Sequence, residues 1–88
     1  MSLNNTFRAL SDPTRRTILQ LLKEKDYSAG DLNEHFSMTF ATLSHHLSIL
    51  KQADLVSVRR NGQKQIYSLN LSVVEQIINE YFIHFKKI

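Results

Sequence analysis

The side chains best suited to chemistry with a polyanion lie in two short segments of the chain. Residues 39–48 carry Thr, Ser and His on one face of a predicted helix and contain no carboxylate. Residues 59–64 carry three cations around an Asn-Gly pair, and no acid occurs between 55 and 70. Hydroxyl and imidazole groups can hydrogen-bond base edges, whereas clustered Lys and Arg attract phosphates. This combination predicts contact with DNA.

The two segments differ in reach, which predicts a division of labour between them. Ser44 and His45 have short side chains near the start of the helix, so they reach base edges only from within a groove. Long, flexible cations suit contacts with the DNA backbone. We therefore expect phosphate contacts from Arg59, Arg60 and Lys64. The alternatives are that His45 only faces solvent and that the cations only keep the protein soluble.

Neighbouring pairs in the helix resemble chemical sites that we do not favour. Adjacent helical residues point about 100° apart, so Ser44 and His45 diverge, and no acid is evident to orient a catalytic dyad. His45 and His46 diverge for the same reason, and we expect one to face DNA while the other packs inward. The chain also lacks a Gly-rich phosphate loop, a thiol and a clustered carboxylate pair. We therefore predict that it is not an enzyme.

Metal binding has one weak candidate. The chain has no cysteine, which excludes disulfides and thiolate metal sites. Glu80 and His84 are four residues apart and share a face of a predicted helix, but a closed zinc site needs four ligands. A second chain would have to supply the rest, and that arrangement stays open. We favour a surface pair at helical spacing and predict no metal and no other cofactor.

A short helix and a turn are predicted directly before the helix that carries residues 39–48. Ser28 with Asp31 forms a variant capping box, with Tyr27 entering the helix that it starts. This helix is predicted to run to about Phe36, and a brief break follows at Ser37-Met38. Two short helices joined by a tight turn place the second one in a DNA major groove.

The second helix begins at Thr39 and has two distinct faces. Its apolar stripe predicts packing against the core, and its opposite face is small and polar. The stripe consists of Leu43, Leu47 and Leu50, and the polar face consists of Ala41, Thr42, Ser44, His45 and Ser48.

The cations Arg59, Arg60 and Lys64 lie in a predicted β-hairpin. Asn61-Gly62 is a strong hairpin signal, because a type I′ turn needs positive φ at both positions. Strands centred on this pair have an apolar face, which we expect to pack inward, and a basic face. The apolar face holds Val56, Val58, Gln65, Tyr67 and Leu69, and the basic face holds Ser57, Arg59, Lys64, Ile66 and Ser68. The predicted fold is mainly α with a small β-hairpin, a winged helix-turn-helix of about five helices and a two-stranded antiparallel wing.

Two helices are predicted before the helix-turn-helix. The first covers about residues 3–10, and the sequence Ser11-Asp12-Pro13 ends it and starts a second helix that runs to about Lys23. Asp12 and Arg16 are four residues apart, so we expect an ion pair between them near the start of the second helix.

The last helix, predicted from Leu71 to the end, carries apolar residues over well over half of its circumference. A core of 88 residues cannot hide so much apolar surface, and an exposed apolar face usually marks a partner surface. The simplest partner is a second copy, because two-fold dimers dominate soluble oligomers. With help from the first helix, the predicted dimer interface consists of Leu3, Phe7, Val74, Ile77, Ile78, Tyr81, Phe82 and Phe85.

Length and composition constrain the number of domains and the class of protein. The 88 residues support one domain, 1–88, and the net charge of +3 is too small to identify a nucleic-acid binder by itself. No apolar run follows a basic start, as in a signal peptide, and no stretch approaches the roughly 20 apolar residues of a membrane span. We therefore expect a cytoplasmic protein that does not insert into membranes.

Successive blocks of the sequence carry a family resemblance. They are Ser-Asp-Pro-Thr-Arg-Arg-Thr-Ile-Leu (11–19), Leu-Ser-His-His-Leu-Ser-Ile-Leu (43–50), Ala-Asp-Leu-Val (53–56), and Arg-Arg-Asn-Gly (59–62) with Tyr-Ser-Leu (67–69). In this order they resemble the ArsR/SmtB family, small dimeric winged-helix repressors of bacteria. The likeness is greatest to the short, metal-independent, SdpR-like autorepressors.

The resemblance implies a fourth helix in the major groove of a palindromic operator, a wing along the neighbouring backbone and terminal helices that dimerise. Many relatives sense metals through a Cys-x-Cys on the third helix, but Asp-Leu-Asn-Glu-His-Phe (31–36) here has no thiol. Phe40 departs from the polar residue often found at its position. Carried onto this sequence, the DNA-facing residues of the helix are Thr39, Phe40, Ala41, Ser44 and His45.

A second class of function uses the same scaffold. A winged helix can serve as a protein-interaction module that does not bind DNA, since fold does not fix function. The acid-free wing and the polar helix face favour a DNA-binding repressor. The sequence does not specify the operator, the regulated genes or an inducing protein or small molecule.

Overall fold

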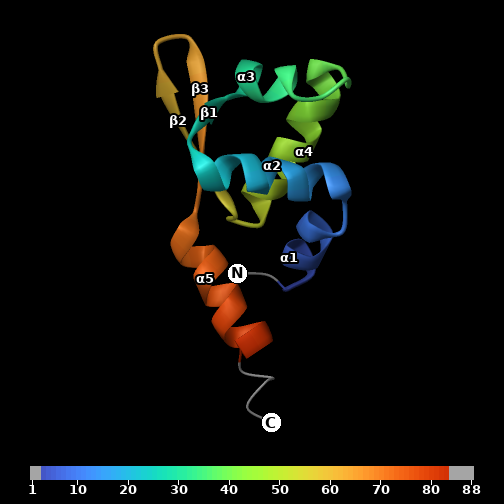
Figure 1. The fold of residues 1–88 in the computed structure, drawn as a ribbon, viewed down its shortest axis with the longest axis vertical. Coiled ribbons are helices and arrows are strands. Elements are labelled where there is room, and N and C mark those ends of the chain that lie inside the picture. The colour runs from blue at the N-terminus through green and yellow to red at the C-terminus, as the bar shows by residue number, and fades with distance from the viewer. Residues whose placement is uncertain (1–2, 84–88) are drawn as a thin grey trace.

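The structure, a computed structural model, describes residues 3–83, without the side chains of 82 and 83. Helices dominate, and a small antiparallel sheet lies along one side (Figure 1), which confirms the predicted fold class. In chain order the elements are α1 (Leu3–Leu10), α2 (Pro13–Glu24), β1 (Tyr27–Ser28), α3 (Ala29–Glu34), α4 (Phe40–Gln52), β2 (Val56–Asn61), β3 (Lys64–Leu69), α5 (Leu71–Ile78) and the π-helical turn η1 (Asn79–Ile83).

The helix-turn-helix consists of α3 and α4, and side-chain caps start both helices. The Ser28 hydroxyl oxygen accepts from the Asp31 N–H at 3.1 Å, which confirms the predicted cap. The Thr39 hydroxyl oxygen accepts from the Thr42 N–H at 3.2 Å and so starts α4. Such caps satisfy backbone donors that have no partner within the helix. α3 ends at Glu34, two residues before the predicted end.

The wing hairpin forms, but its turn lies one residue further along than predicted. A turn centred on Asn61-Gly62 would place Val58 opposite Gln65, two residues away from its actual partner. β2 and β3 pair antiparallel, with Val58 opposite Tyr67 and Arg59 opposite Ile66. Asn61 pairs with Lys64, so the turn consists of Gly62 and Gln63. Of Asn61 and Gly62, only Gly62 has a positive φ, of 65°, so the predicted type I′ turn at Asn61-Gly62 does not form. Because directly opposed residues share a face, the apolar and basic faces follow the predicted division.

The sheet has a third strand that the sequence did not predict. Tyr27 and Ser28 were expected to enter and cap the third helix, but they first pair as β1 with Tyr67 and Ile66 of β3. The strand order is therefore β1-β3-β2. Two residues are too few to show the alternating pattern that identifies a strand. The pairing connects the wing directly to the start of α3.

The core lies where the α4 stripe meets α2, α3 and the end of the wing. Leu43, Leu47 and Leu50 are at most 1% exposed, as their spacing predicts. The side chains that close around them include Ile18, Leu22, Leu32, Leu55, Val56 and Tyr67. This packing fixes the orientation of the opposite, polar face of α4.

The predicted ion pair between Asp12 and Arg16 does not form. Arg16 Nη1 instead donates to the Leu10 carbonyl at 2.7 Å. The Asp12 carboxylate caps α2 by accepting from the Arg15 N–H at 3.2 Å. Burial alone would raise the pKa of the Asp12 carboxyl, but this hydrogen bond and the positive charge of Arg15 lower its pKa overall. Helical spacing does not account for the unpaired carbonyls at the end of α1, which attract the arginine.

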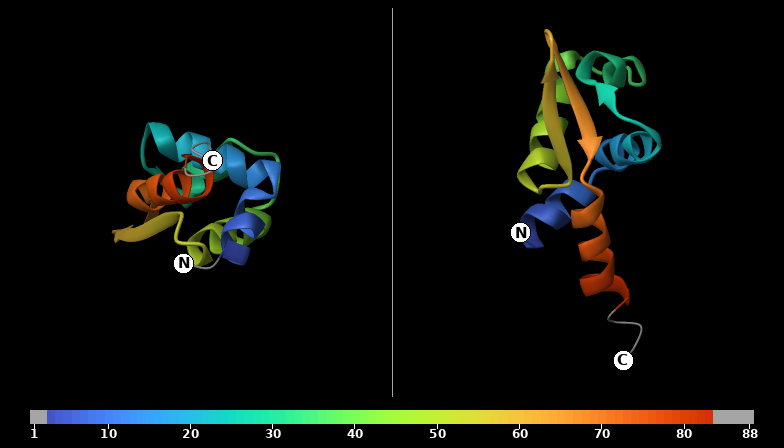
Figure 2. Two further views of the ribbon diagram at one scale, coloured as in Figure 1. Left: turned by 90° about the horizontal axis from the view of Figure 1, so that it is seen from below. Right: turned by 90° about the vertical axis from the view of Figure 1, so that its left-hand side faces the viewer.

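The elements separate into two ends. The wing tip, α3 and the start of α4 lie at one end, whereas α1 and α5 lie at the other (Figures 1 and 2). The long axis between them extends 47 Å. Among the residues that the structure describes, no helix combines the length and apolar character that crossing a membrane would require.

Candidate nucleic-acid interface

The exposed face at the start of α4, with its cap residue, carries the residues of this helix that were expected to face DNA. Leu43 and Leu47 anchor the helix on its inner side and leave the other side in solvent. No acid lies on α4 itself, and Lys51 is its only Lys or Arg residue. The five predicted residues Thr39, Phe40, Ala41, Ser44 and His45 are all exposed, as is Thr42.

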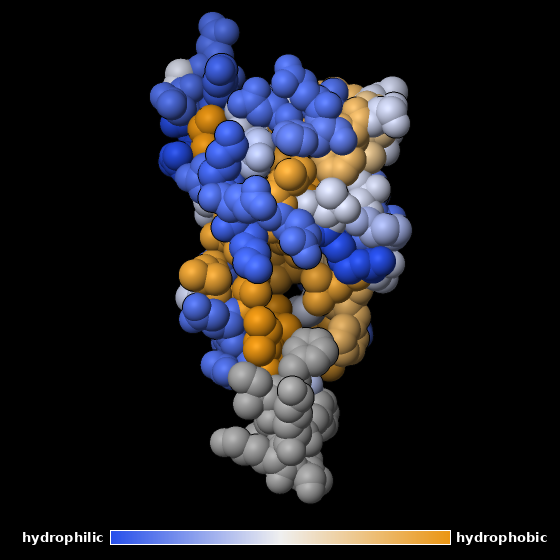
Figure 3. Space-filling view, in the orientation of Figure 1, coloured by the Kyte–Doolittle hydropathy of each residue, from blue (hydrophilic) through white to orange (hydrophobic). Residues whose placement is uncertain are grey.

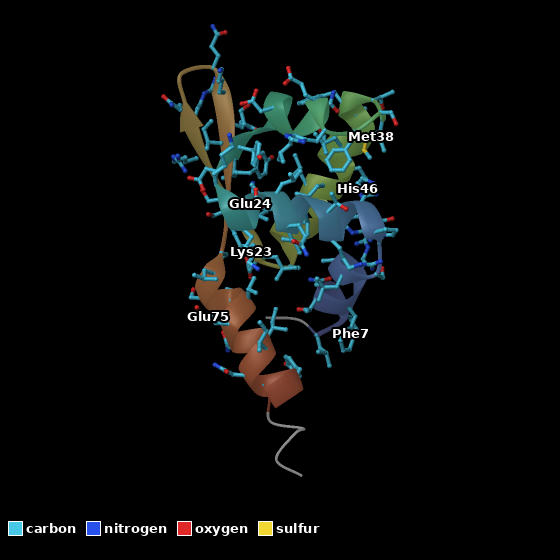
Figure 4. The ribbon with its side chains drawn as sticks, in the orientation of Figure 1. Phe7, Lys23, Glu24, Met38, His46 and Glu75 are labelled. Atoms are coloured by element: carbon cyan, nitrogen blue, oxygen red, sulfur yellow. The ribbon has the colours of Figure 1, made fainter. Side chains whose placement is uncertain are left out.

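The two adjacent histidines separate as predicted, with His45 outward and His46 inward. His46 has a side chain only 14% exposed and belongs to α4 beside α2 (Figure 4). Its Nδ1 lies 3.1 Å from Nη1 of Arg15. A guanidinium can only donate, so Nδ1 accepts this hydrogen bond. Asp12 Oδ2 lies 3.9 Å from the same nitrogen, too far for a hydrogen bond.

The three wing cations are all exposed, but their surroundings differ. Arg59 Nη1 donates to Asp26 Oδ2 at 2.9 Å and to the Ser68 hydroxyl oxygen at 3.0 Å. The hydrogen bond from Arg59 also lowers the pKa of the Asp26 carboxyl. A DNA phosphate would therefore have to compete with the Asp26 carboxylate for Arg59. Asp26 lies far from Arg59 in the sequence, and only the pairing of β1 with β3 brings them together.

Arg60 and Lys64 have no carboxylate partner among the described residues. Arg60 lies on the opposite strand face from Arg59, with its Nε donating to the Gly62 carbonyl at 3.1 Å. Lys64 stands directly opposite Asn61 beside the turn. No ion pair within the described residues would therefore compete with a phosphate for these two cations.

A cleft of about 530 Å³ separates the wing from the helix-turn-helix. Arg60 and Lys64 line its wing side, Asp31 and Glu34 line its α3 side, and Phe40 lies at the start of α4. Carboxylates repel phosphates, so a DNA backbone is expected along the wing side alone. Sequence reasoning did not anticipate this acidic wall.

We expect Lys64 to contribute more than Arg59 to the salt dependence of DNA binding. Replacing Lys64 with Ala should flatten the slope of log K against log salt by roughly one unit for each phosphate that a chain no longer neutralises. Arg59→Ala should have a smaller effect, because Asp26 already compensates the charge of Arg59. Titrations of one DNA fragment at several salt concentrations measure both slopes. Equal slopes for Lys64→Ala and wild type would show that Lys64 does not contact a phosphate.

The surface predicted to dimerise divides into buried and exposed parts. Ile77 is 5% exposed and belongs to the chain's own core, and Val74 and Tyr81 pack partly against that core. Leu3, Phe7 and Ile78 are 42%, 55% and 43% exposed. The Phe82 side chain and Phe85 lie outside what the structure describes.

Apart from Phe40, the exposed large apolar side chains of the described residues belong to α1 and α5, away from the wing tip. Phe7 lies on the outer side of α1 (Figure 4). Apolar surface spreads around α5 and the neighbouring end of the molecule, whereas hydrophilic residues surround the wing (Figure 3). The end opposite the candidate DNA-binding face therefore offers the surface for a partner.

Within residues 3–83, no group of three or more His, Asp or Glu side chains gathers as metal ligands would. Glu80 accepts from Gln76 Nε2 at 3.2 Å, and His84 lies outside the described residues.

We expect DNA affinity to be unchanged by Zn²⁺ or by a chelator. A stoichiometric, chelator-reversible loss of binding would contradict this, and His84→Ala would test whether the last helix is responsible.

Comparison with known proteins identifies related chains. Residues 12–58 match the family described as bacterial regulatory protein, arsR family. The chain is 54% identical over 77 residues to the transcriptional repressor SdpR of Bacillus subtilis, covering 88% of this chain and 86% of that protein. It is 43% identical over 75 residues to an arsenical resistance operon repressor of Staphylococcus xylosus, covering 85% and 72%.

Solved structures show the same fold. The crystal structure of a possible transcriptional regulator for arsenical resistance superimposes with a TM-score of 0.81 at 30% identity, covering 92% of this chain and 83% of that one. The transcriptional repressor BigR from Xylella fastidiosa gives a TM-score of 0.72 at 29% identity, covering 94% and 85%.

Proposed function

Because this chain belongs to the arsR family of bacterial regulatory proteins, whose members here are transcriptional regulators and not enzymes, we propose that it is a dimeric, sequence-specific repressor that does not sense metal. Its partners are a second copy of itself and a palindromic double-stranded operator. It acts as one DNA-binding domain in the cytoplasm, where bacterial DNA lies.

The observation that carries this proposal is the placement of two surfaces at opposite ends of the fold. The acid-free face of α4 and the cations Arg60 and Lys64 share one end. The exposed apolar residues Leu3, Phe7 and Ile78 belong to the helices of the other end. A two-fold dimer through the apolar end would present two α4 helices to successive major grooves. Long cations beside each α4 would then reach the flanking backbone.

A gel shift with competitor DNA tests the proposal. We expect the protein to retard a fragment from upstream of its own gene, and unlabelled copies of that fragment to compete better than scrambled DNA of the same composition. The comparison is made at one stated salt concentration, because nonspecific binding depends strongly on salt. Equal competition by both DNAs would contradict sequence-specific repression. Absence of any shift would favour the protein-interaction module.

His45 is expected to contribute to sequence preference. His45→Ala should lower the ratio of specific to nonspecific affinity by about 1–3 kcal/mol, because the variant cannot hydrogen-bond a base edge while its phosphate contacts remain. Gln52→Ala, an exposed change at the far end of α4, should leave the ratio unchanged. Titrations of operator and scrambled DNA measure it. A uniform loss on both DNAs would assign His45 to the backbone.

A further inference from the structure

Phe40 differs from the other large apolar residues around the turn of the helix-turn-helix. Phe36 and Met38 pack partly against the core. Phe40 is 51% exposed and does not belong to that cluster. Single exposed apolar residues are common on protein surfaces, so exposure alone assigns no role. The position of Phe40 makes it informative, because it is the first residue of α4.

Polar groups next to Phe40 are engaged with one another. The Thr39 hydroxyl oxygen accepts from the Thr42 N–H at 3.2 Å, and the same hydroxyl donates to the Thr42 hydroxyl oxygen at 3.0 Å. Both threonines are therefore committed to the cap at the start of the helix. The neighbouring side chains of Phe40 and Ala41 are exposed and apolar. The start of α4 thus offers an apolar contact, followed one turn later by the polar groups of Ser44 and His45.

The cleft beside Phe40 places this apolar contact next to the backbone-binding cations. Arg60 and Lys64 line the same cleft as Phe40. With phosphates held along the wing side, the ring at the start of α4 would face base edges. Thymine carries the only methyl group that an unmodified base pair presents in the major groove, and aromatic and other apolar side chains can pack against it.

We propose that Phe40 is a specificity-determining residue that packs against the 5-methyl group of a thymine in the operator. The inference rests on the proposed function and adds a base identity to it. The hydrogen-bonding residues Ser44 and His45 would read neighbouring positions on the same groove edge. A preference for thymine over cytosine would then arise at a position where the protein makes no hydrogen bond.

Replacing single thymines with uracil in the bound upstream fragment removes one methyl group at a time and leaves base pairing intact. Wild-type protein should lose about fourfold in affinity at one position in each half-site, the effect of exposing about one methyl group. Phe40→Ala should bind the thymine operator more weakly and lose its sensitivity to uracil at that position. Phe40→Met, which keeps an apolar side chain, should retain part of the sensitivity. Because Phe40 is exposed, both variants should fold as wild type, and urea unfolding checks this.

The outcomes separate the inference from the proposed function. Suppose that wild type binds the fragment specifically but Phe40→Ala keeps the full uracil effect at every position. The proposed contact between Phe40 and thymine is then wrong, whereas the proposed repressor function is not contradicted. An equal loss on operator and scrambled DNA in Phe40→Ala would also overturn it, since that indicates a sugar or phosphate contact. If wild type shows no preference for the fragment over scrambled DNA, both fail together.

Discussion

Replacing Arg15 with Leu should lower the free energy of unfolding by about 2–4 kcal/mol. Arg15 is only 7% exposed, and its Nε donates to the Ala9 carbonyl at 2.9 Å. Its Nη1 donates to His46 Nδ1 at 3.1 Å. Each buried acceptor left without a donor costs about 1–3 kcal/mol. The Arg8 carbonyl, which accepts from Nη2 of Arg15, keeps a donor in the variant because Ser11 also donates to it.

The adjacent arginine provides a matched control. Arg16→Leu makes the same chemical change, but Arg16 is exposed and its side chain donates to the Leu10 carbonyl alone among the described residues. We expect a loss below about 1 kcal/mol. Urea unfolding of both variants at one protein concentration measures the difference, since the stability of a dimer depends on concentration. Equal unfolding midpoints would show that Arg15 does not hold α1, α2 and α4 together.

Replacing Phe7 with Asp should convert the protein from a dimer to a monomer. Wild type should sediment at micromolar concentration with twice the chain mass of 10.2 kDa, and Phe7→Asp with the single mass. A carboxylate placed in an apolar interface loses its hydration without gaining a partner. Operator affinity should then fall by about a hundredfold or more, because two linked half-site contacts become one.

Phe40→Asp is the control for this effect. Phe40 and Phe7 are 51% and 55% exposed, so the two variants make the same change at similarly exposed positions near opposite ends of the fold. Phe40→Asp should keep the double mass, although it weakens DNA binding. A monomeric wild type, or a dimeric Phe7→Asp, would show that α1 does not contribute to the interface.

Local signals predicted the elements around the candidate DNA-binding face. The cap at Ser28, the apolar stripe of α4 and the presence of a hairpin around Gly62 depend on residues close together in the chain, where propensity and side-chain period are informative. The same signals placed the hairpin turn one residue too early, at Asn61-Gly62. They fixed which residues of α4 are buried and which strand face carries Arg59. The exposed positions of Ser44 and His45 follow directly from the stripe.

Contacts between distant residues were beyond that reasoning. β1 is two residues long and forms only because β3 offers an edge. The Asp26–Arg59 pair depends on that strand. Arg15 reaches α1 and His46 because helix packing brings them together, whereas helical spacing suggested an Asp12–Arg16 pair. The burial of Ile77 in the chain's own core is likewise a property of how α5 packs.

Hydroxyl-radical footprinting of the upstream fragment tests the central claim most directly. A two-fold dimer that inserts one α4 into each of two major grooves should protect two blocks of similar sequence, related by a dyad. Their centres should lie one or more helical turns apart, each turn being about 10–10.5 base pairs. Phe7→Asp should lose this paired protection at the same protein concentration. A single protected block, or even cleavage along the whole fragment at saturating protein, would contradict a dimeric, sequence-specific repressor.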